Sequence, residues 1–167
     1  IFHVFNKSNA NYPTLKDPDN SKRFYQALAY YNSTFNKTNL GNFLQENRDY
    51  DPDILLPVEG NFVKYISFCL MPDHYHLLVK IQIDRKFSKY MSDVENSFSR
   101  FFNIKFDRKG PLWQSRFKAV RIKTNEQLLH VTRYIHINST TANLVEKPED
   151  WTFSSYKKIV TEPKYLS

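Results

Sequence analysis

The most constraining feature of the sequence is a pair of β-prone runs followed directly by a helical pattern. Residues 61–71 (NFVKYISFCLM) and 74–83 (HYHLLVKIQI) are rich in β-branched and aromatic side chains, and the Pro72-Asp73 step between them is a turn signal. Residues 84–106 then change to a helical period, with their apolar side chains on one stripe. These segments predict two antiparallel strands followed by a helix that faces the core.

The other segments extend this pattern in both directions. Residues 1–6 and 115–123 have the composition of strands. Ser21 is placed to cap a first helix, and Thr124 with Gln127 three residues later is a capping-box signature for a last one. The first six elements then follow the order β-α-β-β-α-β. We therefore predict an α+β, ferredoxin-like fold, with an antiparallel four-stranded sheet and helices mainly on one face.

The length of 167 residues predicts a single domain over residues 1–167. Within it, residues 32–60 are expected to form a loop-rich insertion with at most one short turn of helix, and residues 148–167 an aromatic C-terminal tail. The single cysteine excludes a disulfide scaffold and a cysteine-rich zinc site. No apolar run is long enough for a transmembrane helix, and the first residues lack a signal-peptide pattern, so we expect a cytoplasmic protein without a membrane partner.

Two histidines on the second predicted strand are candidates for metal binding. His74 and His76 alternate along the strand, so both side chains project to the same face. Two imidazoles at this spacing can converge on one cation. The alternative is that both histidines form ordinary hydrogen bonds at the surface of the sheet, and the pair alone does not decide between these interpretations. His3, on the first predicted strand, could approach the same site.

The last predicted helix carries a second candidate group. Tyr134 and Asn138 lie one turn apart and share a face, whereas His136 points to nearly the opposite side. If Tyr134 meets His74 and His76, Asn138 can reach the same cation, and an amide oxygen with two imidazoles suits Mg²⁺ or Mn²⁺. The alternative is that Tyr134 is a half-buried helix residue and Asn138 an ordinary residue near the helix end.

The charge balance is compatible with nucleic-acid binding. Lysine and arginine number 24 against 17 acidic residues, giving a net charge of +7, and aromatic residues make up 16% of the chain. Cations neutralise phosphates, and aromatic faces stack on unpaired bases. Ordinary surface charge and core aromatics are the alternative. The candidate DNA contacts are Lys80, Arg108, Lys109, Arg116, Lys118, Arg121 and Lys123. On the last predicted strand, Arg116 and Lys118 share one face, whereas Arg121 and Lys123 share the other. These four residues therefore cannot all line one groove.

Four ordered motifs carry a family resemblance. They are MPDHYHLLV (71–79), GPLWQSRFKAV (110–120), RYIHINSTTANLV (133–145) and DWTFSSY (150–156), preceded by an HVFNKS opening. Together they resemble the single-tyrosine HUH transposases of the insertion-sequence-200-like class, with the greatest similarity to the REP-associated branch. Ser139 stands where this family usually has proline.

The resemblance implies an enzyme that cleaves and rejoins single-stranded DNA through a covalent 5′-phosphotyrosine intermediate. By position, Tyr134 matches the nucleophile, and His74, His76 and Asn138 match the ligands of a divalent Mg²⁺ or Mn²⁺ ion. The implied partner is single-stranded or hairpin DNA, the implied assembly a monomer or a homodimer, and the implied location the nucleoid of a bacterial cell.

Three other functions are compatible with parts of the pattern. A catalytically inactive or domesticated protein that binds hairpin DNA would keep the same fold, and the serine at position 139 leaves this open. An RNA-binding module on the same sheet is disfavoured because its Gly-aromatic signature is absent. A histidine-triad nucleotide hydrolase would need a third alternating histidine, where this chain has Leu78.

Overall fold

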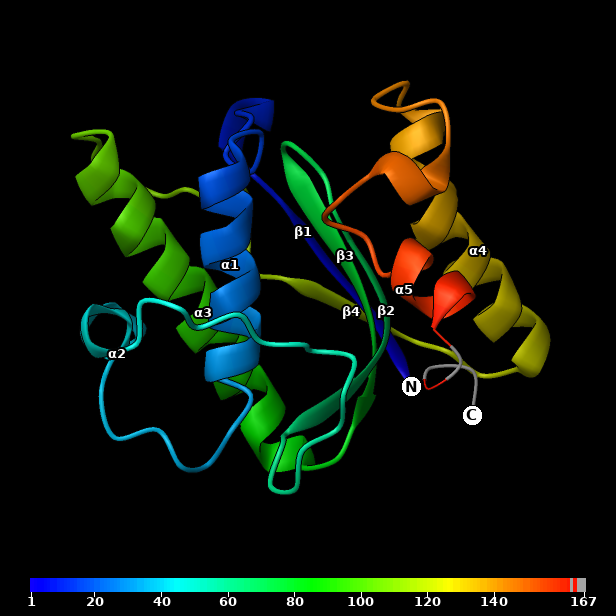
Figure 1. The fold of residues 1–167 in the computed structure, drawn as a ribbon, viewed down its shortest axis with the longest axis horizontal. Helices are drawn as coiled ribbons and strands as arrows, with labels where there is room; N and C mark the ends of the chain where they lie inside the picture. Colours follow the sequence, from blue (N-terminus) through cyan, green and yellow to red (C-terminus); the bar gives the residue numbers. More distant parts are fainter. Residues whose placement is uncertain (163, 165–167) are drawn as a thin grey trace.

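The computed structural model describes residues 1–162 and 164, and it contains one four-stranded antiparallel sheet (Figure 1). The strand order is β2-β3-β1-β4, with every neighbouring pair antiparallel, as the ferredoxin-like prediction requires. The predicted α+β fold is therefore confirmed. The strands are β1 (Phe2–Lys7), β2 (Val63–Leu70), β3 (His74–Ile81) and β4 (Lys118–Arg121).

Helices lie on both sides of the sheet (Figure 1). Helices α1 and α3 pack against each other on one face, whereas α4 packs on the opposite face over β2 and β3. The second face is therefore partly covered, which positions α4 above the strand that carries His74 and His76. The helices are α1 (Pro18–Tyr30), α2 (Leu40–Glu46), α3 (Asp84–Lys105), α4 (Asn125–Thr141) and α5 (Tyr156–Thr161), with 3₁₀ turns at Asn9–Asn11 and Pro148–Asp150.

Two apolar clusters hold these layers together. The larger one lies between the sheet and α1 and α3, where the predicted stripe of α3 is buried except for the half-buried Phe101. The smaller one joins α4 to the other face through Ile135, Leu78 and Cys69. Burial of this apolar surface is the main favourable term in folding. The position of α4 is therefore fixed by side-chain packing on the sheet.

Two element boundaries differ from the sequence prediction. Helix α1 begins at Pro18 and is capped by Asp17, whose side chain accepts the backbone N–H of Asp19. Proline is well suited to the first helical position, so the helix starts before Ser21. Strand β4 is shorter than residues 115–123, because the carbonyl of Ser115 accepts a hydrogen bond from the Asn6 side chain outside the strand ladder.

The two segments expected to be irregular contain some regular structure. The short helix expected within residues 32–60 is α2, which has seven residues and is capped by the Asn39 side chain. In the C-terminal segment the Phe153 carbonyl accepts the Leu70 N–H, and the Ser155 N–H donates to Phe68, so this segment lines the free edge of β2. Of the predicted tail, residues 163 and 165–167 lie outside the described residues. In the described part of the chain, no helix has both the length and the apolar character needed to cross a bilayer.

Candidate active site

A pocket lies on the sheet face that α4 covers, and cross-strand register decides which side chains reach it. Phe5 pairs with His76 on β3 and with Lys118 on β4, while Lys7 pairs with His74. Directly paired residues project to the same face of a sheet, so these side chains gather on one surface. The pocket has a volume of about 300 Å³ and is lined by Phe5, Asn6, Lys7, His74, His76, Gln114, Ser115, Lys118 and Tyr134.

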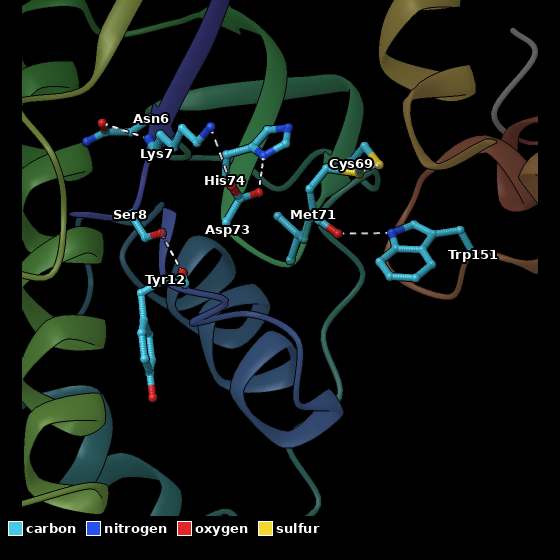
Figure 2. A network of polar contacts seen from close by, with 10 residues as sticks. Asn6, Lys7, Ser8, Tyr12, Cys69, Met71, Asp73, His74 and Trp151 are labelled. Atoms are coloured by element: carbon cyan, nitrogen blue, oxygen red, sulfur yellow. Dashed lines mark hydrogen bonds and ion pairs between the residues drawn. The ribbon is translucent and has the colours of Figure 1, made fainter. Parts of the chain in front are cut away.

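Each imidazole of the His74–His76 pair is held through its Nδ1 atom. Asp73 Oδ1 lies 2.6 Å from His74 Nδ1, and Lys7 Nζ lies 3.5 Å from the other carboxylate oxygen (Figure 2). On the neighbouring strand, His3 Nε2 lies 3.0 Å from His76 Nδ1. Among the described residues neither Nε2 atom has a hydrogen-bond partner, so both are available to an external ligand. Partners of this kind fix the tautomer and orientation of metal-binding histidines.

The buried environment of the site favours the neutral form of the His76 and His3 imidazoles. Burial, reinforced by the nearby His74 and His3, lowers the pKa of His76 to about 3. Burial also lowers the pKa of His3. For Asp73, burial acts to raise the pKa, but the hydrogen bond and charge of His74 and the charge of Lys7 outweigh it, so this pKa is lowered. At neutral pH, His76 is a neutral ring and Asp73 is a carboxylate.

Helix α4 places the phenol of Tyr134 beside the imidazoles of His76 and His3. The ring centroids of Tyr134 and His76 are 5.3 Å apart, and those of Tyr134 and His3 are 6.3 Å apart. The centroids of His74 and His76 are separated by 5.0 Å. Tyr134 remains 44% exposed, whereas His76 is buried. A phenol that is both accessible and directed at two imidazoles can meet a substrate that enters the pocket from solvent.

The opposite side of α4 is fixed to the C-terminal segment. His136 Nε2 lies 2.9 Å from Ser155 Oγ, and the same hydroxyl accepts the backbone N–H of Phe68 on β2 at 2.9 Å. Burial lowers the pKa of His136 to about 4, so this ring is neutral at neutral pH. His136 therefore faces away from the pocket, as its helical spacing predicts. It ties α4 to the sheet edge two residues from Tyr134.

Asn138 is buried one turn beyond Tyr134, and among the described residues its Nδ2 atom has no hydrogen-bond partner. Its side chain is not among those that line the pocket with the imidazole pair. Within the described residues, no three His, Cys, Asp or Glu side chains are grouped to hold a metal. Two imidazoles whose Nδ1 atoms are engaged suit a divalent ion that completes its shell with oxygen ligands.

The predicted basic residues are distributed unevenly around this site. Lys118 lines the pocket, whereas the guanidinium of Arg108 is bound to Asn103 and to the carbonyl of Pro111 in its own loop. Lys80 is on the same strand as the imidazole pair but does not line the pocket. The remaining predicted contacts, Lys109, Arg116, Arg121 and Lys123, are exposed residues outside the pocket lining.

The structure adds site residues that sequence reasoning missed. Lys7 and Phe5 line the pocket because β1 lies between β3 and β4. Gln114 and Ser115 also line it, because the Gln114 N–H donates to the Lys7 carbonyl and holds this segment beside β1. Alternation along residues 1–7 places Lys7 and His3 on one face, but only the strand order shows which face meets His76. Asp73, which the sequence indicates only as a turn residue, contacts both His74 and Lys7.

Comparisons with known proteins find similar sequences among transposases. Residues 58–138 match the family model described as "Transposase IS200 like". A Haemophilus influenzae protein provisionally named as a REP-associated tyrosine transposase is 26% identical over 110 residues, which cover 60% of this chain and 62% of the relative. The REP-associated tyrosine transposase of Escherichia coli K12 is 25% identical over 100 residues, covering 59% and 58%. The chain thus spans about three fifths of the length of these curated relatives.

A solved structure supports the same relationship at the level of the fold. The structure of a REP-associated tyrosine transposase bound to a REP hairpin superposes with a TM-score of 0.66 at 18% identity, covering 97% of this chain and 79% of the other. The predicted resemblance is confirmed: over residues 58–138 this chain is similar to the IS200-like transposases, and over about three fifths of its length it is similar to REP-associated tyrosine transposases.

Proposed function

We propose that the chain cleaves and rejoins single-stranded DNA through a covalent 5′-phosphotyrosine intermediate on Tyr134. The observation that carries this proposal is the approach of the exposed phenol to the oriented imidazole pair, with 5.3 Å between the ring centroids of Tyr134 and His76. The similarity of residues 58–138 to the IS200-like transposases supports the choice of DNA strand transfer as the reaction.

In the proposed reaction, the phenol oxygen of Tyr134 attacks the scissile phosphorus. A bond forms between the tyrosine oxygen and phosphorus, and the bond from phosphorus to the 3′ oxygen breaks. The phenol loses one proton and the departing 3′ oxygen gains one, so the step consumes neither water nor a nucleotide. The phosphodiester is conserved as a phosphotyrosine, and a 3′-hydroxyl can reverse the step and join a new strand.

We propose that His74, His76 and Asn138 hold a divalent Mg²⁺ or Mn²⁺ ion through the two Nε2 atoms and the amide oxygen. Such an ion, when bound, polarises the scissile phosphate and neutralises charge that develops on it. Asp73 and His3 hold the two rings by their Nδ1 atoms, which keeps the Nε2 atoms in place. Lys7 and Lys118 supply fixed positive charge at the pocket wall, where a DNA phosphate would enter.

The proposed substrate is a DNA strand that carries a hairpin. The structural relative is described as bound to a REP hairpin, and the shared fold makes hairpin DNA the first substrate to examine. One chain supplies both the phenol and the imidazole pair. We therefore propose that a single copy carries a complete site, without exchange of α4 between subunits. Mixing Tyr134→Phe with His76→Ala protein should then restore no activity.

The direct experiment incubates the protein with a labelled single-stranded oligonucleotide that contains one hairpin, in the presence of Mn²⁺, and detects a covalent adduct on a denaturing gel. The native protein should form the adduct, Tyr134→Phe should bind the DNA without forming it, and a chelator should abolish the adduct but leave most of the binding. Tyr12→Phe, at another exposed tyrosine, is the matched control. An equal yield of adduct from Tyr134→Phe would refute the proposal, and tight binding with no adduct from the native protein would favour an inactive hairpin-binding protein.

A further inference from the structure

A second pocket lies in the helical layer on the other side of the sheet. It has a volume of about 720 Å³ and is formed by α1, α2 and α3. Its wall includes three cationic side chains, Arg23, Arg100 and Lys105, together with the ring of Phe101. The remaining lining is mostly polar, and the amides of Asn42 and Asn96 are part of it.

The unusual member of this pocket is Arg23. Its guanidinium is 5.1 Å from the centroid of the Phe101 ring, and its Nε atom is buried without a hydrogen-bond partner among the described residues. No ion pair to Arg23 or to Arg100 occurs in the described part of the chain. Burial lowers the pKa of Arg23, with the nearby Tyr31 acting in the opposite direction. A half-buried cation without an anionic partner carries a desolvation cost that a bound anion would offset.

Acidic residues near the pocket do not supply that anion. Asp93 lines the wall, but its carboxylate is held by Lys89 at 2.6 Å and 2.9 Å. Lys105 is already engaged by Asp17 at 3.6 Å and by the Asn20 side chain at 2.8 Å. The two arginines therefore remain as the uncompensated positive charge. The planar fork of a guanidinium matches the oxygens of a phosphate group.

We propose that this pocket binds a backbone phosphate of DNA, with Arg23 and Arg100 as its contacts. The volume is many times that of a phosphate ion, so a nucleotide unit with its sugar and base can enter. Amide side chains in the lining can hydrogen-bond base edges or sugar oxygens. The choice of DNA over a free anion rests on the proposed function and on the net charge of +7.

The pocket is separated from Tyr134 by the sheet, so DNA bound there is not the reacting phosphodiester. Its contribution should appear in affinity and in the salt dependence of binding, and not in the chemical step. Loss of one arginine–phosphate contact should lower the slope of log K against log salt by about one. Failure of this site and failure of the proposed reaction are therefore distinguishable, because binding is measured without reference to the adduct.

The test measures binding of a hairpin-bearing oligonucleotide by fluorescence anisotropy over a range of KCl concentrations. Arg100→Gln should weaken binding about tenfold at moderate salt, and the Arg23→Gln/Arg100→Gln double variant further, with a smaller salt slope in each. The yield of adduct at saturating DNA should not change. Arg85→Gln, at an exposed arginine of α3 outside the pocket, is the matched control and should bind like the native protein.

A second arm separates DNA from a free anion. Inorganic phosphate is titrated at constant ionic strength while thermal unfolding is followed for the native protein and the double variant. If phosphate stabilises only the native protein while both variants bind DNA as tightly as Arg85→Gln, the pocket binds a small anion and the proposal is wrong. The proposal is also wrong if the variants bind DNA like the native protein and phosphate does not change the thermal unfolding of any of them. Arg100 is exposed, so its single variant keeps the test valid even if the double variant unfolds.

Discussion

The phenol of Tyr134 meets the imidazole of His76 edge-on, with 5.3 Å between ring centroids and 79° between ring planes. One residue comes from α4 and the other from β3, which α4 covers. His76 is buried and Tyr134 is 44% exposed, so the phenol lies on the solvent side of the imidazole pair. The proposed nucleophile and the two histidines proposed as metal ligands therefore line one pocket.

Asp73 is predicted to control metal affinity through His74. Asp73→Asn removes the charge that orients the Nδ1 side of His74, and loss of such a partner typically weakens metal binding about 10- to 100-fold. Isothermal titration with Mn²⁺ measures this directly. Asp49→Asn, at an exposed aspartate, should bind like the native protein. Equal Mn²⁺ affinity in the two variants would show that Asp73 has no role in the site.

Ser155 is predicted to hold α4 in position. Ser155→Ala removes the contact to His136 and the acceptor of the Phe68 N–H, leaving buried polar groups unpaired. The free energy of unfolding should fall by about 1–3 kcal/mol in urea denaturation, and the rate of adduct formation should fall while DNA affinity is retained. Ser99→Ala removes a hydroxyl that donates to the Glu95 carbonyl within α3 and serves as control. An unchanged adduct rate in destabilised Ser155→Ala would argue against a positioning role.

The two lysines Lys118 and Lys123 should differ in their effect on DNA binding. Lys118 lines the pocket and Lys123 does not. Lys118→Met should therefore reduce the salt slope of binding by about one and weaken binding at every DNA sequence tested, while Lys123→Met should have a smaller effect. Anisotropy titrations at several salt concentrations give both quantities. The assignment of Lys118 fails if the two variants behave alike.

The pH dependence of stability should carry a contribution from His136. Its pKa is about 4 in the folded protein, against an ordinary value of 6.5. Between these pH values the histidine is protonated in the unfolded chain but neutral in the folded protein. Its contribution to the free energy of unfolding is therefore complete above pH 6.5 and is lost as the pH falls towards 4. The shift corresponds to at most about 3 kcal/mol. Urea denaturation at several pH values measures the slope.

Two histidine variants isolate this contribution from that of the other buried groups. His136→Gln should unfold with a weaker dependence on pH between about 6.5 and 4, whatever its absolute stability. His130→Gln, at an exposed histidine on the same helix, should keep the native slope. The opposing contribution of Glu95, whose pKa is raised by burial, is present in both variants and cancels from the comparison. Identical slopes in both variants would contradict the assignment.

The parts of the fold that follow from local pattern were predictable from the sequence. The hairpin of β2 and β3 and the buried stripe of α3 depend on alternation, turn chemistry and helical period, all of which lie within a few residues. Thr124 likewise caps α4, as its capping-box spacing indicates. The start of α1 was predicted too late because Ser21 is a good cap in isolation, whereas Asp17 before a proline is the better one.

The site was only partly predictable because it depends on contacts between distant strands. The face shared by His74 and His76 follows from alternation, and the opposite orientation of His136 follows from helical spacing. Neither rule shows that His3 meets His76, since that contact requires β1 to lie beside β3. The docking of residues 153–155 on β2 is equally non-local, because it uses backbone groups at a sheet edge.

The most direct measurement locates the covalent bond. The native protein is reacted with the hairpin oligonucleotide and Mn²⁺, the DNA is trimmed by nuclease, and the tryptic peptides are sequenced by mass spectrometry. The account predicts a residual nucleotide attached through phosphate to Tyr134, with a free 3′-hydroxyl on the released strand. A nucleotide attached to any other residue, or cleavage that leaves no protein-linked DNA, would contradict it.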